Sequence, residues 1–596
     1  MTQTLFLKRH AIYCLLILLA NNTFAQYYLR GEIKDEKSQG IQNAKIFLHS
    51  ARALYFSGTY GGFGINVTNL YDSLTVSLDG YETKTIRVRS DQWQNIILKI
   101  SEATVSKSKP KLISITKDTK ETSKFNRVAD DETYFQLVEN NYVNTVGYPN
   151  TGFALNVNKA SYSNVRRFLN MDSPVPPDAV RIEELINYFN LHYREPVNAE
   201  VFNMGSQLTS CPWDSKKQLL FLNTSAKKLD LEKVPPGNFV FLVDVSGSMD
   251  MPNRLPLLKA AFQMFVKNLR KIDKVSIVMY GGTVGVWLQP TSGAEKEKIT
   301  ESIESLTAAG DTPGASAIRF AYQLAQSTFI KGGNNRVILA TDGDFNVGES
   351  SEKALDELIT TERQTGVYLT CLGVGMGNLK DSKLQTLAKK GNGNYAYLDD
   401  IKEAEKVLVK ELTQTFYAVA DDVFMNVNFN PAMVKQYRLV GFDNRKDAVT
   451  DNTSELEGGE IGSGNSTLAI FEIIPTQQNL LTRNTTVADD IATLSLKYTM
   501  TNDTATCQLL YKVKNNYLNI DSTDSDLKFL SAVTMFALKL KQSQYISNDI
   551  DWAFIKNIAS SSADKNNYLQ QEFIKLTDKA DKIYPGKKKK KKKIAL

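Results

Sequence analysis

The residues with the clearest chemical potential are oxygen donors that stand next to apolar runs. Asp244, Ser246 and Ser248 follow the run 239–243, Thr312 lies in a loop with Gly and Pro, and Asp342 follows a second apolar run, 337–339. Carboxylate and hydroxyl oxygens are the ligands that hard divalent cations such as Mg²⁺ or Mn²⁺ prefer. These five residues are therefore candidate metal ligands.

The elements that must position these donors are predicted by the pattern of residues 236–412. Apolar strand patterns alternate there with amphipathic helix patterns, ending in an expected helix from Ile401 to Phe416. Such alternation predicts an α/β domain with a doubly wound parallel sheet and right-handed crossovers. Loops beyond the carboxyl ends of parallel strands meet at one edge of the sheet, so the donors are expected to lie together.

Each donor also has an ordinary structural explanation. Asp244 or Ser246 could cap the following helix, because Asp and Ser are preferred at that position. Thr312 could be a turn residue, and Asp342 precedes Gly343 in a typical turn dipeptide. Their common position at strand ends, in this order, favours the metal site over separate turns and caps.

The order Asp-x-Ser-x-Ser, distal Thr and distal Asp resembles the metal-ion-dependent adhesion site of von Willebrand factor type A domains. The resemblance implies that Ser246, Ser248 and Thr312 ligate the cation directly, and that Asp244 and Asp342 do so directly or through water. It also implies an open coordination position for an Asp or Glu of a partner protein. We hypothesise that such binding draws the metal toward Thr312 and shifts the final helix.

The segments on both sides of this domain resemble one bacterial family, which places a type A domain between two family-specific regions. The resemblance extends from about residue 126 to 585 and is carried by phrases such as 160–167, 180–189 and 437–445. We expect an α-containing N-terminal flank at 126–235, and a C-terminal region at 413–585 with a β-sandwich and a helical end.

The N-terminal flank supports two finer predictions. Asp178 is expected to cap a helix, because it follows a Pro-rich turn and precedes an apolar stripe. Arg166 and Arg167 could bind an anionic partner, but we expect them to pair with Glu183 and Glu184.

The first 25 residues have the pattern of a secretory signal peptide. A basic start at Lys8 and Arg9, an apolar stretch at 11–20 and small residues before Gln26 follow the usual order. Export to the periplasm, cell surface or extracellular space is expected. No later apolar run approaches the length of a membrane span, although peripheral association with the envelope stays open.

Residues 26–101 show short strand patterns separated by turns, which predict a small β-sandwich. The Gly-x-Ile opening at 31–33 and the closing Gly80-Tyr81 resemble carboxypeptidase regulatory-like domains. Residues 102–125 are rich in Ser, Lys and Thr and are interpreted as a linker.

The formal net charge of +6 does not describe the body of the chain. Lys587 to Lys593 form a basic run within the tail 586–596, and Lys8 and Arg9 belong to the leader. Removing these nine charges turns +6 into −3, so the charge no longer supports nucleic-acid binding. The tail itself is expected to be solvated, because like charges repel one another.

Few residues are available for catalysis or cross-linking. Beyond the leader the chain has three cysteines: Cys371 is expected to be buried, and a Cys211–Cys507 bridge stays open. The only histidines there are His49 and His192, too few for a His-rich zinc site and far apart for a triad. We therefore expect a non-enzymatic, metal-dependent binding module. A purely structural metal is the second interpretation, and a metal-assisted hydrolase the third.

Overall fold

The computed structural model describes residues 27–99 and 132–585 apart from short internal segments, in two compact units, Met1–Lys120 and Glu121–Leu596. The predicted signal peptide, linker and lysine-rich tail lie outside the described residues. The undescribed internal segments are 37, 43, 52, 59, 79–80, 198–199, 282, 309–313, 344–351, 444–458, 484–488 and 502–504.

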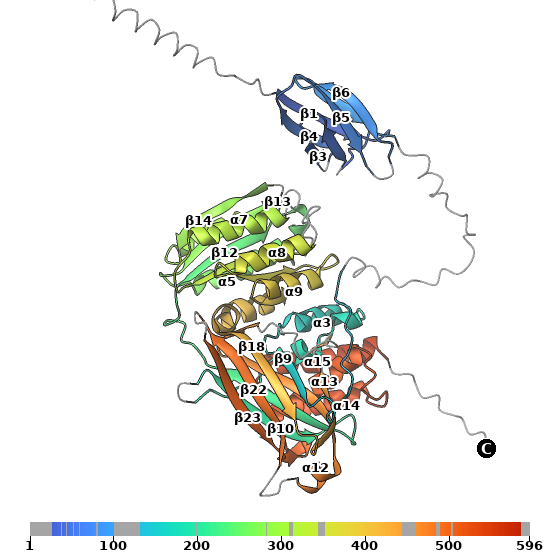
Figure 1. Cartoon of the computed structure of the whole chain (residues 1–596), viewed down its shortest axis with the longest axis vertical. Coiled ribbons are helices and arrows are strands. Elements are labelled where there is room, and N and C mark those ends of the chain that lie inside the picture. The colour runs from blue at the N-terminus through green and yellow to red at the C-terminus, as the bar shows by residue number, and fades with distance from the viewer. Residues whose placement is uncertain are drawn as a thin grey trace, which may run out of the picture. The chain divides into compact units, whose positions relative to one another are not determined.

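The N-terminal unit consists of two sheets that share one core (Figure 1). One sheet has the order β4-β1-β7 and the other β3-β2-β5-β6, with β1 and β7 parallel. Alternating residues of these strands, such as Leu29, Ile46 and Leu74, fill the core. The likeness to carboxypeptidase regulatory-like domains stays a prediction. The strands are β1 (Tyr27–Lys34), β2 (Lys45–Leu48), β3 (Ala53–Phe56), β4 (Gly62–Val67), β5 (Tyr71–Ser77), β6 (Lys84–Arg89) and β7 (Trp93–Ile97).

A six-stranded sheet of the order β14-β13-β12-β15-β16-β17 forms the centre of the α/β domain. All its neighbours are parallel except β13 and β14, which corrects the prediction of a wholly parallel sheet. Only residue 282 separates these two strands, whereas a parallel crossover needs about a dozen residues. The strands are β12 (Gly237–Asp244), β13 (Lys274–Gly281), β14 (Thr283–Ser292), β15 (Asn334–Thr341), β16 (Val367–Val374) and β17 (Tyr395–Leu398).

Helices cover both faces of this sheet, so its central strands are buried on both sides and almost wholly apolar. Helices α5 (Leu255–Lys267) and α6 (Lys296–Glu304) pack on the face that carries Phe241. The remaining connections between strands contain α7 (Gly314–Ser327), α8 (Glu352–Arg363) and α9 (Asp381–Lys390). Helices α7 and α9 contribute to the core on the opposite face of the sheet.

The expected helix from Ile401 to Phe416 is interrupted. It consists of α10 (Ile401–Glu405), a π-helical turn η3 (Lys406–Lys410) and α11 (Leu412–Phe416). Glu411 stands at the break, and its carboxylate accepts hydrogen bonds from Lys159 Nζ at 3.1 Å and Lys406 Nζ at 2.9 Å. The partner from the N-terminal flank explains why local helix propensity did not reveal the break.

The two flanks together build one pair of sheets, which corrects the assignment of the sandwich to the C-terminal region alone. One sheet has the order β24-β10-β11-β21-β19-β8, and the other β20-β18-β22-β23 with β9 beside β18. Both sheets contribute to one core. Strands of the N-terminal flank are β8 (Val143–Asn144), β9 (Asn150–Ala154), β10 (Phe202–Ser210) and β11 (Gln218–Ala226). Strands of the C-terminal flank are β18 (Ala418–Phe429), β19 (Val434–Val440), β20 (Gly459–Gly462), β21 (Ser466–Pro475), β22 (Asp490–Met500), β23 (Thr506–Lys514) and β24 (Tyr517–Leu518), with the short helix α12 (Gln477–Leu481) after β21.

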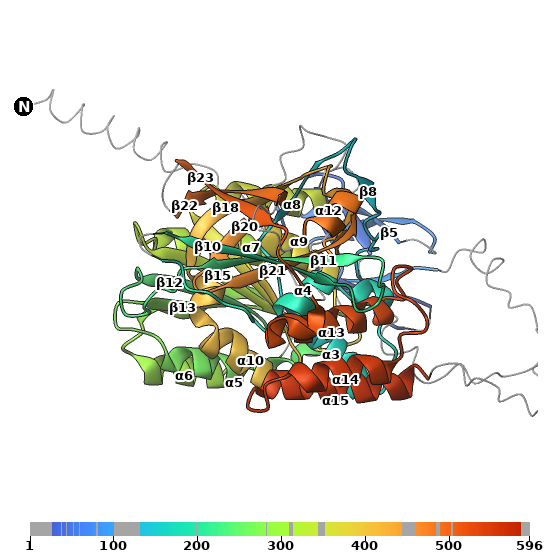
Figure 2. The same ribbon diagram turned by 90° about the horizontal axis from the view of Figure 1, so that it is seen from below.

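A helical layer covers the other face of the six-stranded flank sheet (Figure 2). It consists of α3 (Ala160–Asn170), α4 (Ile182–Asn187), α13 (Ser525–Leu540), α14 (Trp552–Ser562) and α15 (Tyr568–Ile583). Helix α13 is buried around nearly its whole circumference, because it lies between the sheet and the outer helices. Among the described residues, no helix is long and apolar enough to cross a membrane.

Two predictions for the N-terminal flank are wrong. Asp178 lies in the short helix η1 (Pro177–Ala179) and accepts a hydrogen bond from the Leu137 N–H at 2.9 Å, while α4 begins later, at Ile182. Arg166 and Arg167 do not pair with Glu183 and Glu184. The Glu183 carboxylate accepts from the Phe442 N–H, and that of Glu184 accepts from Arg181.

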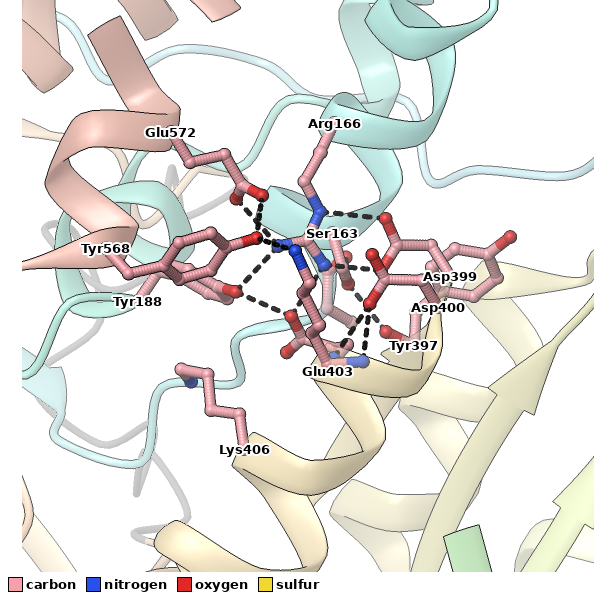
Figure 3. A network of polar contacts seen from close by, with 12 residues as sticks. Ser163, Arg166, Tyr188, Tyr397, Asp399, Asp400, Glu403, Lys406, Tyr568 and Glu572 are labelled. Carbon is pink, nitrogen blue, oxygen red and sulfur yellow. Dashed lines mark hydrogen bonds and ion pairs between the residues drawn. The ribbon is translucent and has the colours of Figure 1, made fainter. Parts of the chain in front are cut away.

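Arg166 instead forms the centre of a junction between the flanks and the α/β domain (Figure 3). Its guanidinium donates to Asp399 after β17, to Glu403 on α10 at 2.7 Å and to Glu572 on α15 at 2.9 Å. The side chain of Arg166 is only 2% exposed. Neighbouring Arg167 pairs with Glu132 at 2.7 Å. Both arginines therefore hold segments of this chain together.

The three cysteines of the described residues are free thiols, so the open Cys211–Cys507 bridge is absent. Cys371 is buried in β16, as expected.

Candidate metal site

Asp244 ends strand β12 and is fully buried. Its Oδ1 accepts from the Ser246 N–H at 2.9 Å, and its Oδ2 accepts from Thr341 Oγ1 at 2.9 Å and, more weakly, from the Tyr280 hydroxyl at 3.4 Å. These donors come from the ends of three adjacent strands, β12, β15 and β13. The sheet therefore fixes the orientation of the carboxylate at its carboxyl edge.

Ser246 and Ser248 lie in the loop that follows, with their Oγ atoms 3.1 Å apart. The capping explanation for Ser246 does not hold, since its side chain makes no capping bond to the short helix η2 (Gly247–Met249) and α5 begins only at Leu255. Two oxygens bound side by side to an octahedral Mg²⁺ at about 2.1 Å are about 3 Å apart. The hydroxyl pair thus has the spacing of two neighbouring ligands of one cation.

Asp342 follows strand β15, is fully buried, and is held by Arg254. Arg254 Nη1 donates to Asp342 Oδ2 at 2.6 Å and to the Ser248 carbonyl at 2.6 Å. Its Nη2 donates to the Met376 carbonyl and to Asn378 Oδ1, both at 2.9 Å. One guanidinium therefore connects the loop after β12, the loop after β15 and the loop after β16.

Arg254 was missed by the sequence analysis. It is 5% exposed and stands at the N-cap position of α5, directly before the helix. An arginine at the positive end of a helix is unfavourable there, which was the available signal that it serves another purpose.

Thr312, the fifth candidate ligand, lies outside the described residues and cannot be placed. The structure therefore brings Asp244, Ser246 and Ser248 together at the loop after β12. It also places the Asp342 carboxylate close enough to raise the pKa of Asp244.

Burial, together with a smaller effect of the nearby Asp342 carboxylate, raises the pKa of Asp244 from its usual value of 3.8 to about 6, against the hydrogen bonds that favour the charged form. A buried pair of carboxylates with adjacent hydroxyls fits a hard divalent cation. Mg²⁺ or Mn²⁺ held here by Asp244, Ser246, Ser248 and Asp342 would supply the positive charge that Asp244 lacks among the described residues and an electrophilic position for a further oxygen ligand.

A second group of ligand atoms has a simpler explanation. His192, Asp524 and Asp526 present ligand atoms within 4.8 Å of one another. Asp524 caps α13 by accepting from the Asp526 N–H, and Asp526 accepts from the His192 N–H at 3.1 Å. These bonds organise the start of α13, so we assign no metal there.

Three family models match this chain. The von Willebrand factor type A domain matches residues 238–411, a model described as von Willebrand factor matches 128–221, and "Uncharacterized protein YfbK, C-terminal" matches 414–583. The Escherichia coli K12 protein described as "Uncharacterized protein YfbK" is 36% identical over 470 residues, which cover 75% of this chain and 81% of that protein. This chain belongs to the YfbK family. It is a type A domain protein with a YfbK-like C-terminal region, and type A domains are in general modules of protein interaction and adhesion.

Other proteins are similar to parts of this YfbK-family chain at lower identity. The magnesium-chelatase 67 kDa subunit of Chlorobaculum tepidum is 28% identical over 192 residues, 29% of this chain and 30% of that protein. Human inter-alpha-trypsin inhibitor heavy chain H3 is 27% identical over 170 residues, 27% of this chain and 19% of that protein. A solved von Willebrand factor type A protein from Catenulispora acidiphila has a TM-score of 0.38 and 14% identity, covering 65% of this chain and 91% of that one.

Proposed function

We propose that this protein is an exported, metal-dependent binding module of the cell envelope. Its type A domain holds Mg²⁺ or Mn²⁺ through Asp244, Ser246, Ser248, Thr312 and Asp342, and an Asp or Glu of a partner protein completes the coordination. The partner is a protein and not a nucleic acid, and the function is binding without catalysis.

One observation carries the proposal. Two serine hydroxyls 3.1 Å apart lie beside the fully buried Asp244, whose hydrogen-bond donors in the described part of the chain are all neutral groups. Burying an ionised carboxylate among neutral groups costs free energy that a cation would offset. The neutral hydroxyls also leave a bound cation strongly electrophilic, so an incoming carboxylate gains a strong bond.

The chain's own residues divide the work at this site. Asp244 and the serine pair present oxygens from the loop after β12, while Arg254 fixes Asp342 and the three surrounding loops. The N-terminal unit, with its likeness to carboxypeptidase regulatory-like domains, serves as a spacer or adhesion accessory. Among the described residues of the second unit, the one histidine, His192, contacts the start of α13 and not these loops, which favours binding over hydrolysis.

The test is a pull-down from envelope extract with the chain from residue 26 onward, in Mg²⁺ and in EDTA. Ser246→Ala and Thr312→Ala remove proposed ligands, and Ser561→Ala removes an exposed hydroxyl of α14 as a matched control. A partner held by wild type and by Ser561→Ala in Mg²⁺, but lost in EDTA and in both other variants, supports the proposal. A partner held equally under all conditions would assign binding to the flanks and leave the metal a structural role.

A further inference from the structure

A cavity of about 340 Å³ lies beside the Arg166 junction. None of its lining residues belongs to the loops that carry Asp244, Ser246, Ser248 and Asp342, which we call the metal loops. Its walls come from three parts of the chain: the N-terminal flank, the end of the α/β domain and the start of α15. It is lined by Arg166, Tyr188, Lys402, Glu405, Lys406, Lys410, Asn567, Tyr568 and Leu569. This volume is at the small end of the range of pockets that bind small molecules.

One wall is basic. Lys402, Lys406 and Lys410 follow one another along α10 and the π-helical turn, against a single lining carboxylate, Glu405. The carboxylates Asp399, Glu403 and Glu572 are not among the lining residues, and they accept hydrogen bonds from Arg166 (Figure 3).

The three lysines differ in whether their ammonium groups already pair with a carboxylate. Lys406 pairs with Glu411 at 2.9 Å, and Lys410 with Glu405 at 3.2 Å. Lys402 Nζ donates to the Tyr568 hydroxyl at 3.2 Å, and within the described part of the chain it has no carboxylate partner. Lys402 is therefore the group best placed to receive an anion, with Lys410 as the exposed second cation.

The remaining walls are aromatic and aliphatic. The ring of Tyr188 is fully buried and lies 4.2 Å from Lys406 Nζ, measured to the ring centroid. The Tyr568 ring lies 4.7 Å from Lys402 Nζ, is 47% exposed, and stands next to Leu569. An exposed ring beside an ammonium group that has no carboxylate partner among the described residues offers a stacking surface and a charge within reach of one small molecule.

The backbone also departs from regular geometry at this wall. The turn Lys406–Lys410 is π-helical. Such turns are rare in proteins overall, but those that occur are often found at functional sites. Here the turn places Lys406 and Lys410 along the same cavity.

The geometry points to a binding site for a small aromatic anion, whose phosphate or carboxylate contacts Lys402 and Lys410 while its ring packs on Tyr568 and Leu569. The site is separate from the metal loops and does not rest on the proposed metal function. Because the ligand would contact α10, the π-helical turn and α15 together, it would stabilise the connection between the α/β domain and the C-terminal helices.

The test is isothermal titration calorimetry of the chain from residue 26 onward with phenyl phosphate and benzoate. EDTA is present throughout, so that no metal can capture either anion. Inorganic phosphate and benzyl alcohol separate the contributions of the charge and the ring. Lys402→Gln removes the charge, Lys402→Arg keeps it, and Lys556→Gln removes an exposed lysine of α14 that pairs with Asp578, as a matched control.

We expect saturable one-to-one binding of at least one aromatic anion, weakened about tenfold or more by Lys402→Gln and retained in Lys402→Arg and Lys556→Gln. Benzyl alcohol should not bind. Inorganic phosphate binding as tightly as phenyl phosphate would overturn the aromatic part of the proposal. No saturable binding of either aromatic anion, or equal binding to Lys402→Gln, would overturn the proposal as a whole.

Discussion

The metal loops and the Arg166 junction both bury carboxylates, but they neutralise them differently. At the junction, Arg166 contacts three carboxylates, and Lys402 and Lys406 stand close by. In the metal loops, Arg254 contacts Asp342, whereas Asp244 accepts, among the described residues, from a main-chain N–H and hydroxyl groups alone. Each carboxylate of the junction thus has an arginine partner, whereas Asp244 has no cationic partner in the described part of the chain.

This difference separates a structural cluster from a binding site. Paired buried charges connect segments and need nothing from solution, while an unpaired buried carboxylate among hydroxyls is stabilised when a cation arrives. If this difference is real, removing Arg166 should lower the free energy of unfolding whether or not Mg²⁺ is present. Removing Arg254 should lower it by an amount that depends on Mg²⁺.

The largest effect is expected for Arg166→Met. The change leaves three carboxylates without their shared partner, and we expect the free energy of unfolding of the second unit to fall by about 3–5 kcal/mol. Urea denaturation with and without Mg²⁺ measures this loss, which Mg²⁺ should not restore. Lys556→Met, which breaks an exposed pair with Asp578, should cost less than about 1 kcal/mol. Equal losses in the two variants would contradict the structural role of the junction.

Arg254→Met should give the second largest effect and should depend on metal. Asp342 loses its cation, so we expect a loss of about 2–3 kcal/mol in EDTA. A bound divalent cation can replace the missing charge, and the stabilisation by Mg²⁺ should therefore be larger in the variant than in wild type. Melting curves in EDTA and Mg²⁺ test this. A smaller Mg²⁺ effect in the variant would mean that Arg254 serves mainly to hold the loops in position.

The pH dependence sharpens the same comparison. Because burial raises the pKa of Asp244 to about 6, the metal-free folded state binds a proton that the unfolded state has already released. In EDTA, stability should therefore fall as pH rises from about 4 to about 6, by about 1 kcal/mol per pH unit at most. Mg²⁺ needs the ionised carboxylate, so its stabilising effect should grow over the same interval. The slope in EDTA should be absent in Asp244→Asn, and an unchanged slope there would assign it to other groups.

The smallest effect on the metal-free protein is expected for Ser246→Ala. The change removes one hydroxyl of the partly buried Ser246–Ser248 pair, so the free energy of unfolding in EDTA should change by less than about 1 kcal/mol. The added stability in Mg²⁺ should nevertheless be strongly reduced. A variant that responds to Mg²⁺ like wild type would remove Ser246 from the set of ligands.

The sequence was sufficient for the α/β domain and for placing Asp244 and Asp342 at one edge of its sheet, while the metal stays a prediction. Apolar strands followed by Asp244 and Asp342 are local patterns, and a sheet with parallel central strands necessarily brings their ends together. The antiparallel edge strand β14 could also have been foreseen, because no helix pattern separates it from β13.

The flanks could not be predicted in this way. Strand β11 pairs with β21, which follows the α/β domain in the sequence, and nothing local to β11 indicates that partner. The break at Glu411 depends likewise on Lys159, and the contacts of Arg254 depend on three separate loops. Contacts between distant segments decide these features, whereas periodicity reports only which face of an element is buried.

The pairing of β11 with β21 has a consequence for how the protein is made. The α/β domain is inserted between the two halves of the flank sheets, and its ends are adjacent: Asn334 beside β12 donates to the Phe416 carbonyl at 2.6 Å, and the Phe239 and Phe416 rings lie 5.9 Å apart. During synthesis the hairpin β10–β11 leaves the ribosome long before β21 exists. Folding of the inserted domain first would shorten the loop that the flank strands must close. The sandwich should therefore be the last part of the second unit to assemble. A chain that ends after Phe416 should carry a folded domain beside a β10–β11 hairpin in which β11 lacks its partner β21.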